Sequence, residues 1–284
     1  MTMEDLLAYT IGDKKYEVSV KDCPPFHYGR PVRLSREDTD IVYTQPWYEE
    51  GHTSVNFLSE EEFASLKSGL TQSVAKIIRN ELGHTVPADF SLERYHDVVT
   101  TREDHFKVVS KTRDLFSEDF NFPVKEVLPK FEKILGFGLT DINPEDGKEL
   151  HIIVRINRPG SNDYNPPHKD VYERVDEADY IPPFVNLWIP IAGVTESSSL
   201  PLAPGSHKLP EDQVLRTHDG AVVEGNRYRV RMIKEWGGSN RLERAKVDYG
   251  QVLFFSGHLI HGLAVNAEPD TTRVALEFRL FKRD

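Results

Sequence analysis

The sequence has little cysteine, no long apolar run and no excess of positive charge. Its 284 residues include Cys23 as the single cysteine, which excludes an intramolecular disulfide and favours a reducing, cytoplasmic setting. Asp and Glu number 46 against 35 Lys and Arg, for a net charge of −11, so we do not expect binding to nucleic acid, which needs a basic surface. No stretch approaches the roughly 18 apolar residues of a transmembrane helix, and the N-terminus lacks a signal-peptide pattern. Peripheral membrane contact and the oligomeric state stay open.

The residues that are present are those of an ordinary globular protein. Hydrophobic residues make up 38% and aromatic residues 10%, and a chain of this length buries a full core without cross-links. Ser59 and Glu62 have the spacing of a capping box, and apolar residues recur behind them at helical spacing, which predicts a helix over 60–82. A second helix is predicted to begin near Pro123, a residue tolerated at the first helical position, and to end at Gly136.

After about residue 150 the helical spacing gives way to short β-branched and aromatic runs. Clusters of Pro and Gly separate these runs, which we predict as strands at 151–157, 184–191, 227–233, 251–255 and 273–281. Many short strands and few helices favour a mainly β fold with flanking helices, built as a sandwich or barrel. Since no flexible linker is visible, we expect one domain over 1–284. In it, 1–150 would supply an irregular lead-in (1–40) and buttressing helices, and 151–284 the β core.

Three polar residues in the β region are candidates for a metal site. His168 and Asp170, separated by Lys169, form with the distant His261 the 2-His-1-carboxylate set that binds non-haem Fe(II) and leaves other positions open. On a strand, His168 and Asp170 would point to the same side. Random placement gives a His-x-Asp pair about once in a chain of this composition, so an exposed loop pair and a structural His261 are the competing interpretations. His258, three residues before His261, competes for the ligand role.

An arginine downstream of His261 is a candidate for binding a 2-oxo acid co-substrate. Arg273 opens the last predicted strand, whose even positions are apolar, so its side chain shares the opposite face with Glu277 and Arg279. A guanidinium group in a cavity can make a bidentate bond to a carboxylate. Arg279 is the weaker candidate because it lies roughly 20 Å further along the strand. A solvent-facing Arg273 is the alternative interpretation.

Five segments follow one another in the order of a known enzyme family. They are HIIVRINRPGS (151–161), PPHKD (166–170), VNLWIPI (185–191), LPLAPGSHK (200–208) and YGQVLFFSGHLIHGLAVNAEPDTTRVAL (249–276). In these segments the chain resembles the phytanoyl-CoA dioxygenase-like branch of the Fe(II)/2-oxoglutarate-dependent oxygenases. The last segment is the most specific, and the resemblance covers 151–281 well and 47–82 weakly. In one departure, Glu196-Ser197-Ser198-Ser199 replaces the usual Asn-Gly before the Pro-Gly-Ser-His turn.

The resemblance implies a double-stranded β-helix (jelly-roll, cupin-like) core and an enzyme that uses Fe(II), 2-oxoglutarate and O2. It implies His168, Asp170 and His261 as the iron ligands and Arg273 as the anchor of 2-oxoglutarate. Hydroxylation of a small molecule, with succinate and CO2 as co-products, is the usual outcome in such enzymes. The carboxylate at Asp170 argues against halogenation, which in related enzymes needs that ligand to be absent.

The resemblance also implies that two strands of the core line the co-substrate pocket. Arg155 on one strand and Asn186 and Trp188 on another are therefore candidates for contact with 2-oxoglutarate. Trp188 lies between apolar neighbours and is equally well explained as a core residue. His207, in the Pro-Gly-Ser-His turn, is expected to be structural and not a ligand.

A stripe of arginine bears on the substrate. Arg227, Arg229 and Arg231 alternate with other residues in the predicted strand 227–233, which would place their three guanidinium groups on one face. Such a stripe could bind the carboxylate or phosphate of a small anionic substrate, such as a sugar acid or a lipid head group. The alternative is an exposed strand face that nearby acids balance. We therefore expect an anionic small molecule, with a sugar acid preferred.

Two other classes of function are compatible with this fold. A jelly-roll can be a non-catalytic ligand-binding or carbohydrate-binding module, in which the His and Asp residues serve only local structure. A metal-dependent isomerase of the cupin type would bind a metal without consuming 2-oxoglutarate. The fold alone does not decide among the three.

Overall fold

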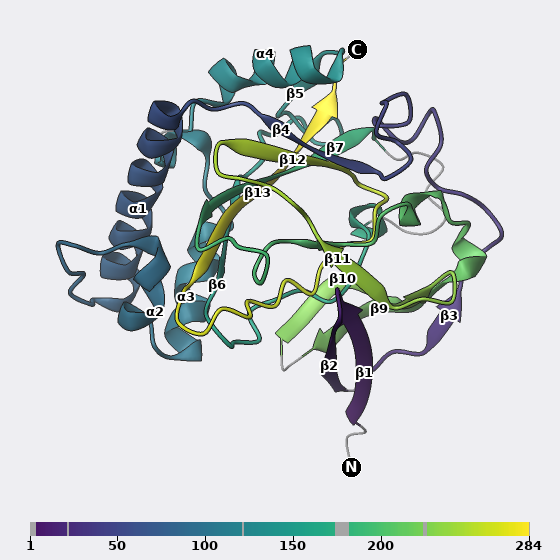
Figure 1. Cartoon of the computed structure of the whole chain (residues 1–284), viewed down its shortest axis with the longest axis horizontal. Helices are drawn as coiled ribbons and strands as arrows, with labels where there is room; N and C mark the ends of the chain where they lie inside the picture. The colour runs from purple at the N-terminus through teal and green to yellow at the C-terminus, as the bar shows by residue number, and fades with distance from the viewer. Residues whose placement is uncertain (1–3, 22, 121, 174–181, 224–225, 284) are drawn as a thin grey trace.

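The computed structural model describes residues 4–21, 23–120, 122–173, 182–223 and 226–283. Within these residues two β-sheets form the middle of the molecule, and α-helices cover the outer face of one of them (Figure 1). The two sheets curl toward each other as a double-stranded β-helix, which confirms the predicted mainly β fold with flanking helices. That 1–284 forms a single domain stays a prediction.

The first sheet has six strands and carries most of the site. In order they are β4 (His52–Asn56), β12 (Gln251–Ser256), β7 (Phe184–Ala192), β13 (Arg273–Lys282) and β5 (Leu139–Thr140), while β6 (Ile153–Asn157) also pairs with β13. Val274 and Leu276 of β13 pack in the core under the helices, whereas Arg273 and Glu277 line a cavity on the other face. The alternation predicted for this strand is confirmed.

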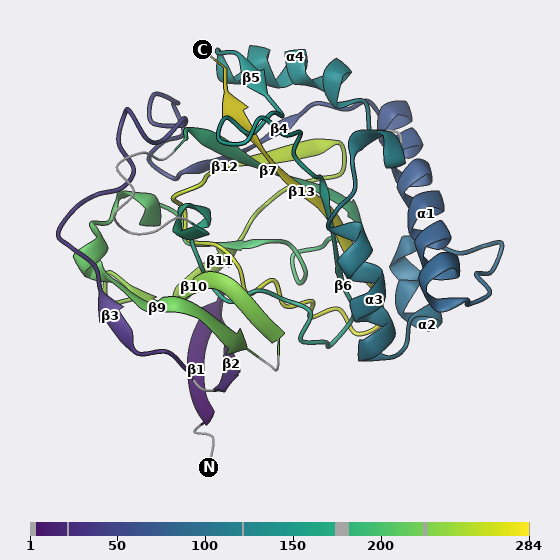
Figure 2. The same cartoon turned by 180° about the vertical axis from the view of Figure 1, so that it is seen from behind.

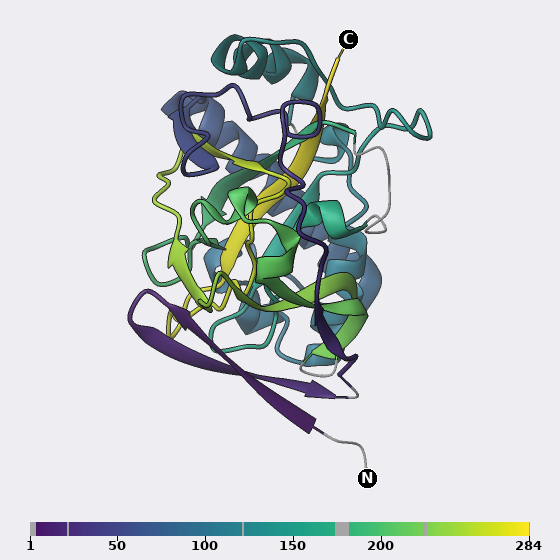
Figure 3. The same cartoon turned by 90° about the vertical axis from the view of Figure 1, so that its right-hand side faces the viewer.

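The second sheet has seven strands, three of which come from the N-terminus. The sheet contains β10 (Asn226–Trp236), β9 (Val214–Val223), β2 (Lys14–Lys21), β1 (Glu4–Ile11), β11 (Arg241–Arg244), β8 (Pro201–Leu202) and β3 (Phe26–Tyr28), the last paired with β9. The prediction of an irregular lead-in over 1–40 is therefore wrong. Its signal was the two-residue Gly12-Asp13 loop between two alternating runs, which suits a β-hairpin. Figure 3 shows this hairpin along one edge of the molecule.

The helices bury their apolar faces against the six-stranded sheet. They are α1 (Glu60–Leu82), α2 (Tyr95–Val98), α3 (Arg102–Thr112) and α4 (Val124–Leu135). The predicted helix over 60–82 is confirmed, including the capping box between Ser59 and Glu62. Leu70 of α1 and Phe131 of α4 are fully buried in the same apolar cluster as the outward residues of β7 and β13. None of the described helices is long and apolar enough to cross a membrane.

Helix α4 begins next to Pro123, as predicted, although the proline itself is not a helical residue. Pro123 is the N-cap residue and lies just outside the helix, and Gly136 ends the helix in the left-handed conformation as expected. A proline at the N-cap or at the first helical position costs no helical hydrogen bond, because the first N–H groups of a helix have no partner within it. The helix therefore still covers the end of the sheet at β5.

Candidate metal centre

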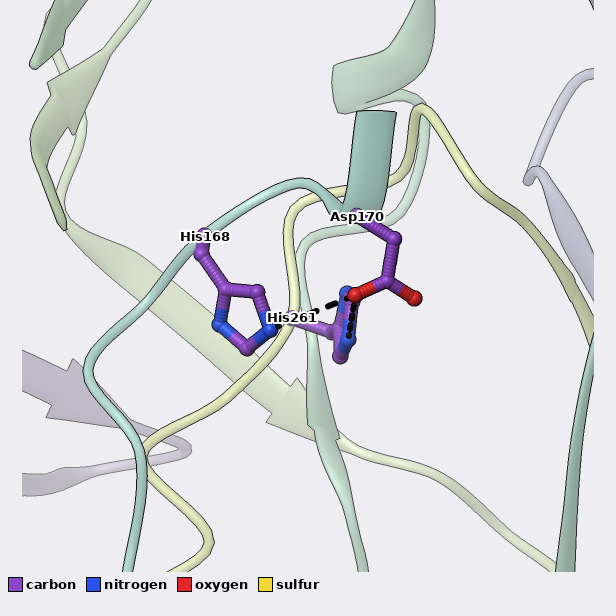
Figure 4. A group of neighbouring side chains, drawn as sticks. All are labelled: His168, Asp170 and His261. Carbon is purple, nitrogen blue, oxygen red and sulfur yellow. Dashed lines mark ion pairs between the residues drawn. The ribbon is translucent and has the colours of Figure 1, made fainter. Parts of the chain in front are cut away.

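The three residues predicted as metal ligands lie together in the interior, between the two sheets. His168 Nε2 is 3.5 Å and His261 Nε2 is 3.8 Å from Asp170 Oδ1, and one ligand atom from each residue lies within 4.8 Å of the others. Figure 4 shows the three side chains converging. None of them is more than 7% exposed. Two imidazole nitrogens and a carboxylate oxygen are donors that suit Fe(II), so the residues present fit this metal.

A short backbone pairing, and not a strand, brings the ligands together. His168 and His261 form an isolated antiparallel bridge, in which each N–H donates to the carbonyl of the other residue at 2.9 and 3.0 Å. The prediction that His168 and Asp170 share a strand is wrong, because Asp170 begins the 3-10 helix Asp170–Glu173. Pro166 and Pro167 before the bridge have no N–H to extend a ladder, so the pairing stays short.

Both imidazole rings are oriented by carbonyl groups two residues earlier in the chain. His168 Nδ1 is 2.7 Å from the carbonyl oxygen of Pro166, and His261 Nδ1 is 3.0 Å from that of Leu259. Since a carbonyl oxygen only accepts, each Nδ1 carries the proton and donates it. The Nε2 lone pair of each ring is then available, and Nε2 is the atom that faces Asp170.

The charges around Asp170 keep this carboxyl group ionised. Burial alone would raise its pKa, but the charge of His261, the hydrogen bond that His168 donates when its ring is protonated, and the charge of Arg279 outweigh burial and lower that pKa. Arg279 Nη2 lies 3.9 Å from Asp170 Oδ1. Burial lowers the pKa of His261, whereas in His168 the hydrogen bond and charge of Asp170 outweigh burial and raise the pKa. The group therefore offers one negative charge to a cation.

Lys169, between the two ligands, faces away from them. It is fully buried, and its Nζ lies 2.7 Å from Glu211 Oε1. Tyr172 donates a hydrogen bond to the other oxygen of Glu211, and Arg216 Nη1 lies 3.2 Å from the same atom. This buried cluster ties the turn that carries His168 and Asp170 to the second sheet.

Gly262 allows the two ligand-bearing segments to approach each other. Its φ is 126°, and a Cβ atom at this position would come within 2.5 Å of the carbonyl oxygen of Pro166 and 3.2 Å of His168 Nδ1. Glycine is the residue that accepts both this conformation and this close approach. Any side chain here would displace the segment that holds His168.

Arg273 is buried at the start of β13, next to the metal group's cavity. Its Nη1 donates to Asn157 Oδ1, its Nε donates to the carbonyl of Ser198 at 3.2 Å, and its guanidinium lies over the Trp188 ring, 5.0 Å from the ring centre. Among the described residues, Nη2 has no hydrogen-bond partner. Burial lowers the pKa of Arg273 to about 9 because it disfavours the cation, an effect that a bound carboxylate would reverse.

Two more buried N–H groups on the concave side lack a partner within the described part of the chain. They are Nε1 of Trp188 and Nδ2 of Asn186, both on β7. Trp188 lies beside Arg273, and Asn186 is opposite Arg279 in the β7–β13 register. A buried donor that lacks a partner costs about 1–3 kcal/mol and is rare in native proteins. Nη2 of Arg273 and Nε1 of Trp188 are thus two donors without partners at one buried guanidinium, and they fit a small carboxylate-bearing molecule such as 2-oxoglutarate.

Arg155 lines the same cavity but already has a carboxylate partner. Its Nη2 lies 2.7 Å from Glu277 Oε1 and its Nε lies 3.0 Å from Oε2 of the same residue. This bidentate pair links β6 to β13 and balances the guanidinium charge. A role for Arg155 in holding 2-oxoglutarate stays a prediction.

A cavity of about 610 Å³ extends from the metal group to helix α3. His168, His261 and Arg273 line it together, so the metal group and the arginine face one space. Asn157, which accepts from Arg273, and Glu277 also contribute to the wall. The arrangement places a metal-ligating set, a cation for a carboxylate and room for a second molecule side by side.

Residues 52–273 match the family described as Phytanoyl-CoA dioxygenase (PhyH). The chain belongs to this family. It is thus an oxygenase of the iron- and 2-oxoglutarate-dependent type, as the resemblance implied, and the matched region contains the metal group and ends at Arg273. No protein with a curated description matches the sequence.

Solved structures similar to this PhyH-family chain share little sequence with it. AviO1 from Streptomyces viridochromogenes Tue57 has 14% identity and a TM-score of 0.46, over 88% of this chain and 96% of that one. SnoN from nogalamycin biosynthesis, described as a non-heme alpha ketoglutarate dependent epimerase, has 12% identity and a TM-score of 0.42, over 83% and 79%. SnoK from the same biosynthesis, described as a carbocyclase of that kind, has 14% identity and a TM-score of 0.43, over 90% and 88%.

Of the arginine stripe predicted for this PhyH-family member, Arg231 has a described side chain, and it is not among the residues that line the cavity. Arg231 is 8% exposed and lies over the Tyr172 ring, 6.0 Å from its centre. Register shifts between β10 and β9 interrupt the simple alternation between Arg227 and Arg231. The side chains of Arg227 and Arg229 lie outside the described residues, and the substrate role of the stripe stays a prediction.

The two other histidines weighed from the sequence lie outside the metal group. His207 Nε2 donates to the carbonyl of Tyr48 at 2.7 Å, and its ring meets the Tyr48 ring edge-on. His258 Nε2 lies 3.1 Å from the carbonyl of Thr39. Both rings therefore support the loop that leads into β4.

Sequence reasoning missed three features of the site. Asn157 was overlooked although it lies two residues after Arg155 on the same strand face. The contact of Arg279 with Asp170 depends on a register that no local pattern reveals. The segment at 196–199, which departs from the family pattern, also reaches the site, because the carbonyl of Ser198 accepts a hydrogen bond from Arg273.

Proposed function

We propose that this protein is an Fe(II)- and 2-oxoglutarate-dependent hydroxylase of a small anionic substrate. His168, Asp170 and His261 would hold the iron, and Arg273 would bind a carboxylate of 2-oxoglutarate. The observation that carries the proposal is the meeting, in one cavity, of a buried His-Asp-His group and a buried arginine whose Nη2 has no partner among the described residues. When bound, Fe(II) with 2-oxoglutarate and O2 supplies the oxidation that turns a substrate C–H into C–OH, with succinate and CO2 released.

The residues of this chain provide binding, orientation and charge balance. Carbonyl groups of Pro166 and Leu259 hold the protons of both imidazoles on Nδ1 and so keep Nε2 directed at the metal position. Asp170 supplies the negative charge, and Arg279 restrains that carboxylate. The presence of this carboxylate supports hydroxylation over halogenation, because no coordination position is left for a halide in its place.

The co-substrate would lie between the metal group and Arg273. Asn157 and the carbonyl of Ser198 hold the guanidinium, and Nη2, which has no partner among the described residues, would be the donor to the carboxylate. Trp188 stacks under it and adds its own N–H, which the second oxygen of a carboxylate would satisfy. Asn186 would donate to a polar group nearer the metal, and Arg155 would contribute charge at the wall of the pocket.

Anaerobic addition of Fe(II) and 2-oxoglutarate tests the proposal. The wild-type protein is expected to develop a visible charge-transfer band, and His168→Ala and Asp170→Ala are expected to lose it. His258→Gln is the matched control, because His258 is equally buried in the same segment but lies outside the group. Retention of the band in both ligand variants would refute the ligand assignment.

Two further outcomes distinguish the alternative functions. Succinate release on addition of a substrate is expected for the hydroxylase, whereas a cupin-type isomerase would bind the metal and release none. A protein that binds neither Fe(II) nor 2-oxoglutarate would be a ligand-binding module. Screening anionic metabolites for succinate release would identify the substrate.

A further inference from the structure

One face of helix α3 forms a wall of the cavity. Arg102, Phe106, Val109 and Arg113 all line it, and their spacing places them in one row along the helix. We call these four residues the α3 row. Arg102 and Arg113 are exposed, and Phe106 has 63% of its surface exposed on the wall of the cavity, so its ring is accessible to a molecule bound there.

The α3 row is held in a fixed position by buried contacts on the inner side of the helix. His105 lies 3.1 Å from the hydroxyl of Tyr95 through Nδ1 and 3.3 Å from Asp163 Oδ2 through Nε2. At the other end, Thr112 Oγ1 donates to the carbonyl of Val154 in β6 at 3.0 Å. Figure 2 shows α3 lying against β6. A wall fixed at both ends presents its side chains in one arrangement, which lowers the entropic cost of binding.

The charges on the cavity wall favour an anion near α3. Its acidic residues each have a cation at ion-pair distance, in the pairs Glu103–Lys107 (2.9 Å), Asp163–Arg158 (3.0 Å) and Glu277–Arg155 (2.7 Å). Arg102 and Arg113 add positive charge to this balanced wall. Both also interact within the protein, but a guanidinium has five N–H donors and can bind a carboxylate as well.

We propose that the α3 row selects the substrate, and that the substrate is an organic acid with an apolar body. The body would pack on Phe106 and Val109, and the anionic group would bind Arg102 or Arg113. The inference rests on the proposed function, because it places the substrate in the cavity that the metal group shares. It adds a binding subsite separate from the one at Arg273.

The size of the cavity leaves room for such a molecule. Its volume of about 610 Å³ falls among sites for drug-sized ligands, which range over roughly 300–1,000 Å³. 2-Oxoglutarate is a short dicarboxylate and would fill only the part near Arg273. The rest of the space runs to the α3 row, so a second, larger molecule fits beside the co-substrate.

The apolar part of the row argues against the sugar acid that the sequence favoured. An aromatic or aliphatic body removes more of the apolar surface of Phe106 and Val109 from water than a hydroxylated sugar ring does, and it buries no hydroxyl groups that would need hydrogen-bond partners. Arg102 and Arg113 lie about 16 Å apart along the helix at 1.5 Å per residue. The body of the substrate would therefore lie between them, with its anionic group at one end.

Calorimetric titration of the metal-free protein with three probes tests the inference. The probes are 4-phenylbutyrate, 4-phenylbutanol with the same body and no charge, and gluconate with the charge and no apolar body. We expect 4-phenylbutyrate to bind about ten-fold more tightly than either of the others. Phe106→Ser, and at least one of Arg102→Gln and Arg113→Gln, should weaken its binding by about five-fold or more.

Two control variants make the result specific. Lys111→Gln removes the same charge from the same helix at an exposed position outside the cavity wall, and it should leave binding unchanged. Arg273→Gln should also retain probe binding, since the subsite at α3 is separate. Thermal unfolding of each variant confirms that it is folded.

Several results would overturn the inference. One is equal affinity for the three probes, or tighter binding of gluconate. Another is a loss of 4-phenylbutyrate affinity in Lys111→Gln as large as that in the α3 variants. The last is a loss of that affinity in Arg273→Gln with none in the α3 variants. The Fe(II) and 2-oxoglutarate band, measured on the same preparations, separates the two proposals. A normal band without any α3 effect rejects this inference alone, and α3-dependent probe binding without a band rejects the hydroxylase alone.

Discussion

Lys169 Nζ lies 2.7 Å from Glu211 Oε1, and both side chains are almost completely buried. Because Lys169 stands between His168 and Asp170, this ion pair connects the turn of the metal group to the second sheet. Lys169 and Arg216 together hold the pKa of Glu211 below its ordinary value against the effect of burial, which would raise it. The pair is thus a point where stability and metal binding are coupled.

Glu211→Gln should destabilise the protein by about 3–5 kcal/mol, because two buried cations lose their carboxylate partner. Urea unfolding of the metal-free protein measures this change. Glu103→Gln, which removes one partner of an exposed ion pair with Lys107, is the control and should change stability by less than about 1 kcal/mol. Equal effects of the two substitutions would contradict the structural role of the buried pair.

Gly262→Ala should lower iron affinity by about ten-fold or more, because the new Cβ would displace Pro166 and the ring of His168. Fe(II) titration under anaerobic conditions, followed by the charge-transfer band, measures the affinity. Gly238→Ala is the control, since Gly238 also has a positive φ but a Cβ atom there would meet no other atom within 4 Å. A normal iron affinity in Gly262→Ala would show that the ligand segments can separate without loss.

Arg273→Gln should weaken binding of 2-oxoglutarate by about ten- to hundred-fold, the range expected for loss of a charge-assisted bond. Titration of the Fe(II)-loaded protein with 2-oxoglutarate gives the affinity. Arg155→Gln is the matched comparison, and its effect should be smaller because Arg155 already binds Glu277. If Arg155→Gln had the larger effect, the anchor would be Arg155 and not Arg273.

Acid should destabilise the protein through His207. Its Nε2 donates to Tyr48, and its buried Nδ1 has no hydrogen-bond partner in the described part of the chain, so burial lowers its pKa from 6.5 to about 4. The unfolded chain takes up a proton as pH falls through 6.5, whereas the folded chain does so only near 4. The free energy of unfolding should therefore fall as pH drops from 6.5 toward 4. Above pH 6.5 His207 is neutral in both states, so the stability that depends on its neutral form is fully present there.

Urea unfolding of the metal-free protein at pH 7 and pH 5 tests the role of His207. The wild type should lose about 1–2 kcal/mol more than His207→Gln, because glutamine keeps a donor for Tyr48 but does not titrate. Equal losses in the two proteins would assign the acid sensitivity to other groups.

The sequence predicted those parts of the fold that depend on local signals. The capping box at Ser59 and the apolar alternation of β13 are properties of neighbouring residues, and both are present. The N-terminal hairpin carried a comparable signal at Gly12-Asp13, but the surrounding strands are rich in charge and their burial depends on β11. Predicting the hairpin with certainty would therefore have required knowledge of its tertiary contacts.

The sequence predicted those site residues that stand at fixed spacings within a motif. The spacing from His261 to Arg273 can be read directly from the sequence, and the structure brings the predicted ligands His168 and Asp170 next to His261. The contact of Arg279 with Asp170 and the wall formed by Arg102 and Phe106 arise from segments distant in sequence. No periodicity within one segment contains that information.

The pairing of β1 with β11 has a consequence for how the chain folds during synthesis. Thr10 pairs with Arg241, roughly 230 residues later, so at about 5–20 residues per second the first strand waits on the order of ten seconds or more for its partner. Tyr9, which donates to the carbonyl of Ile233, waits almost as long. The nascent hairpin must therefore avoid wrong partners on the ribosome, and the lysines of β2 and the acidic start of β1 supply the charge that discourages such association.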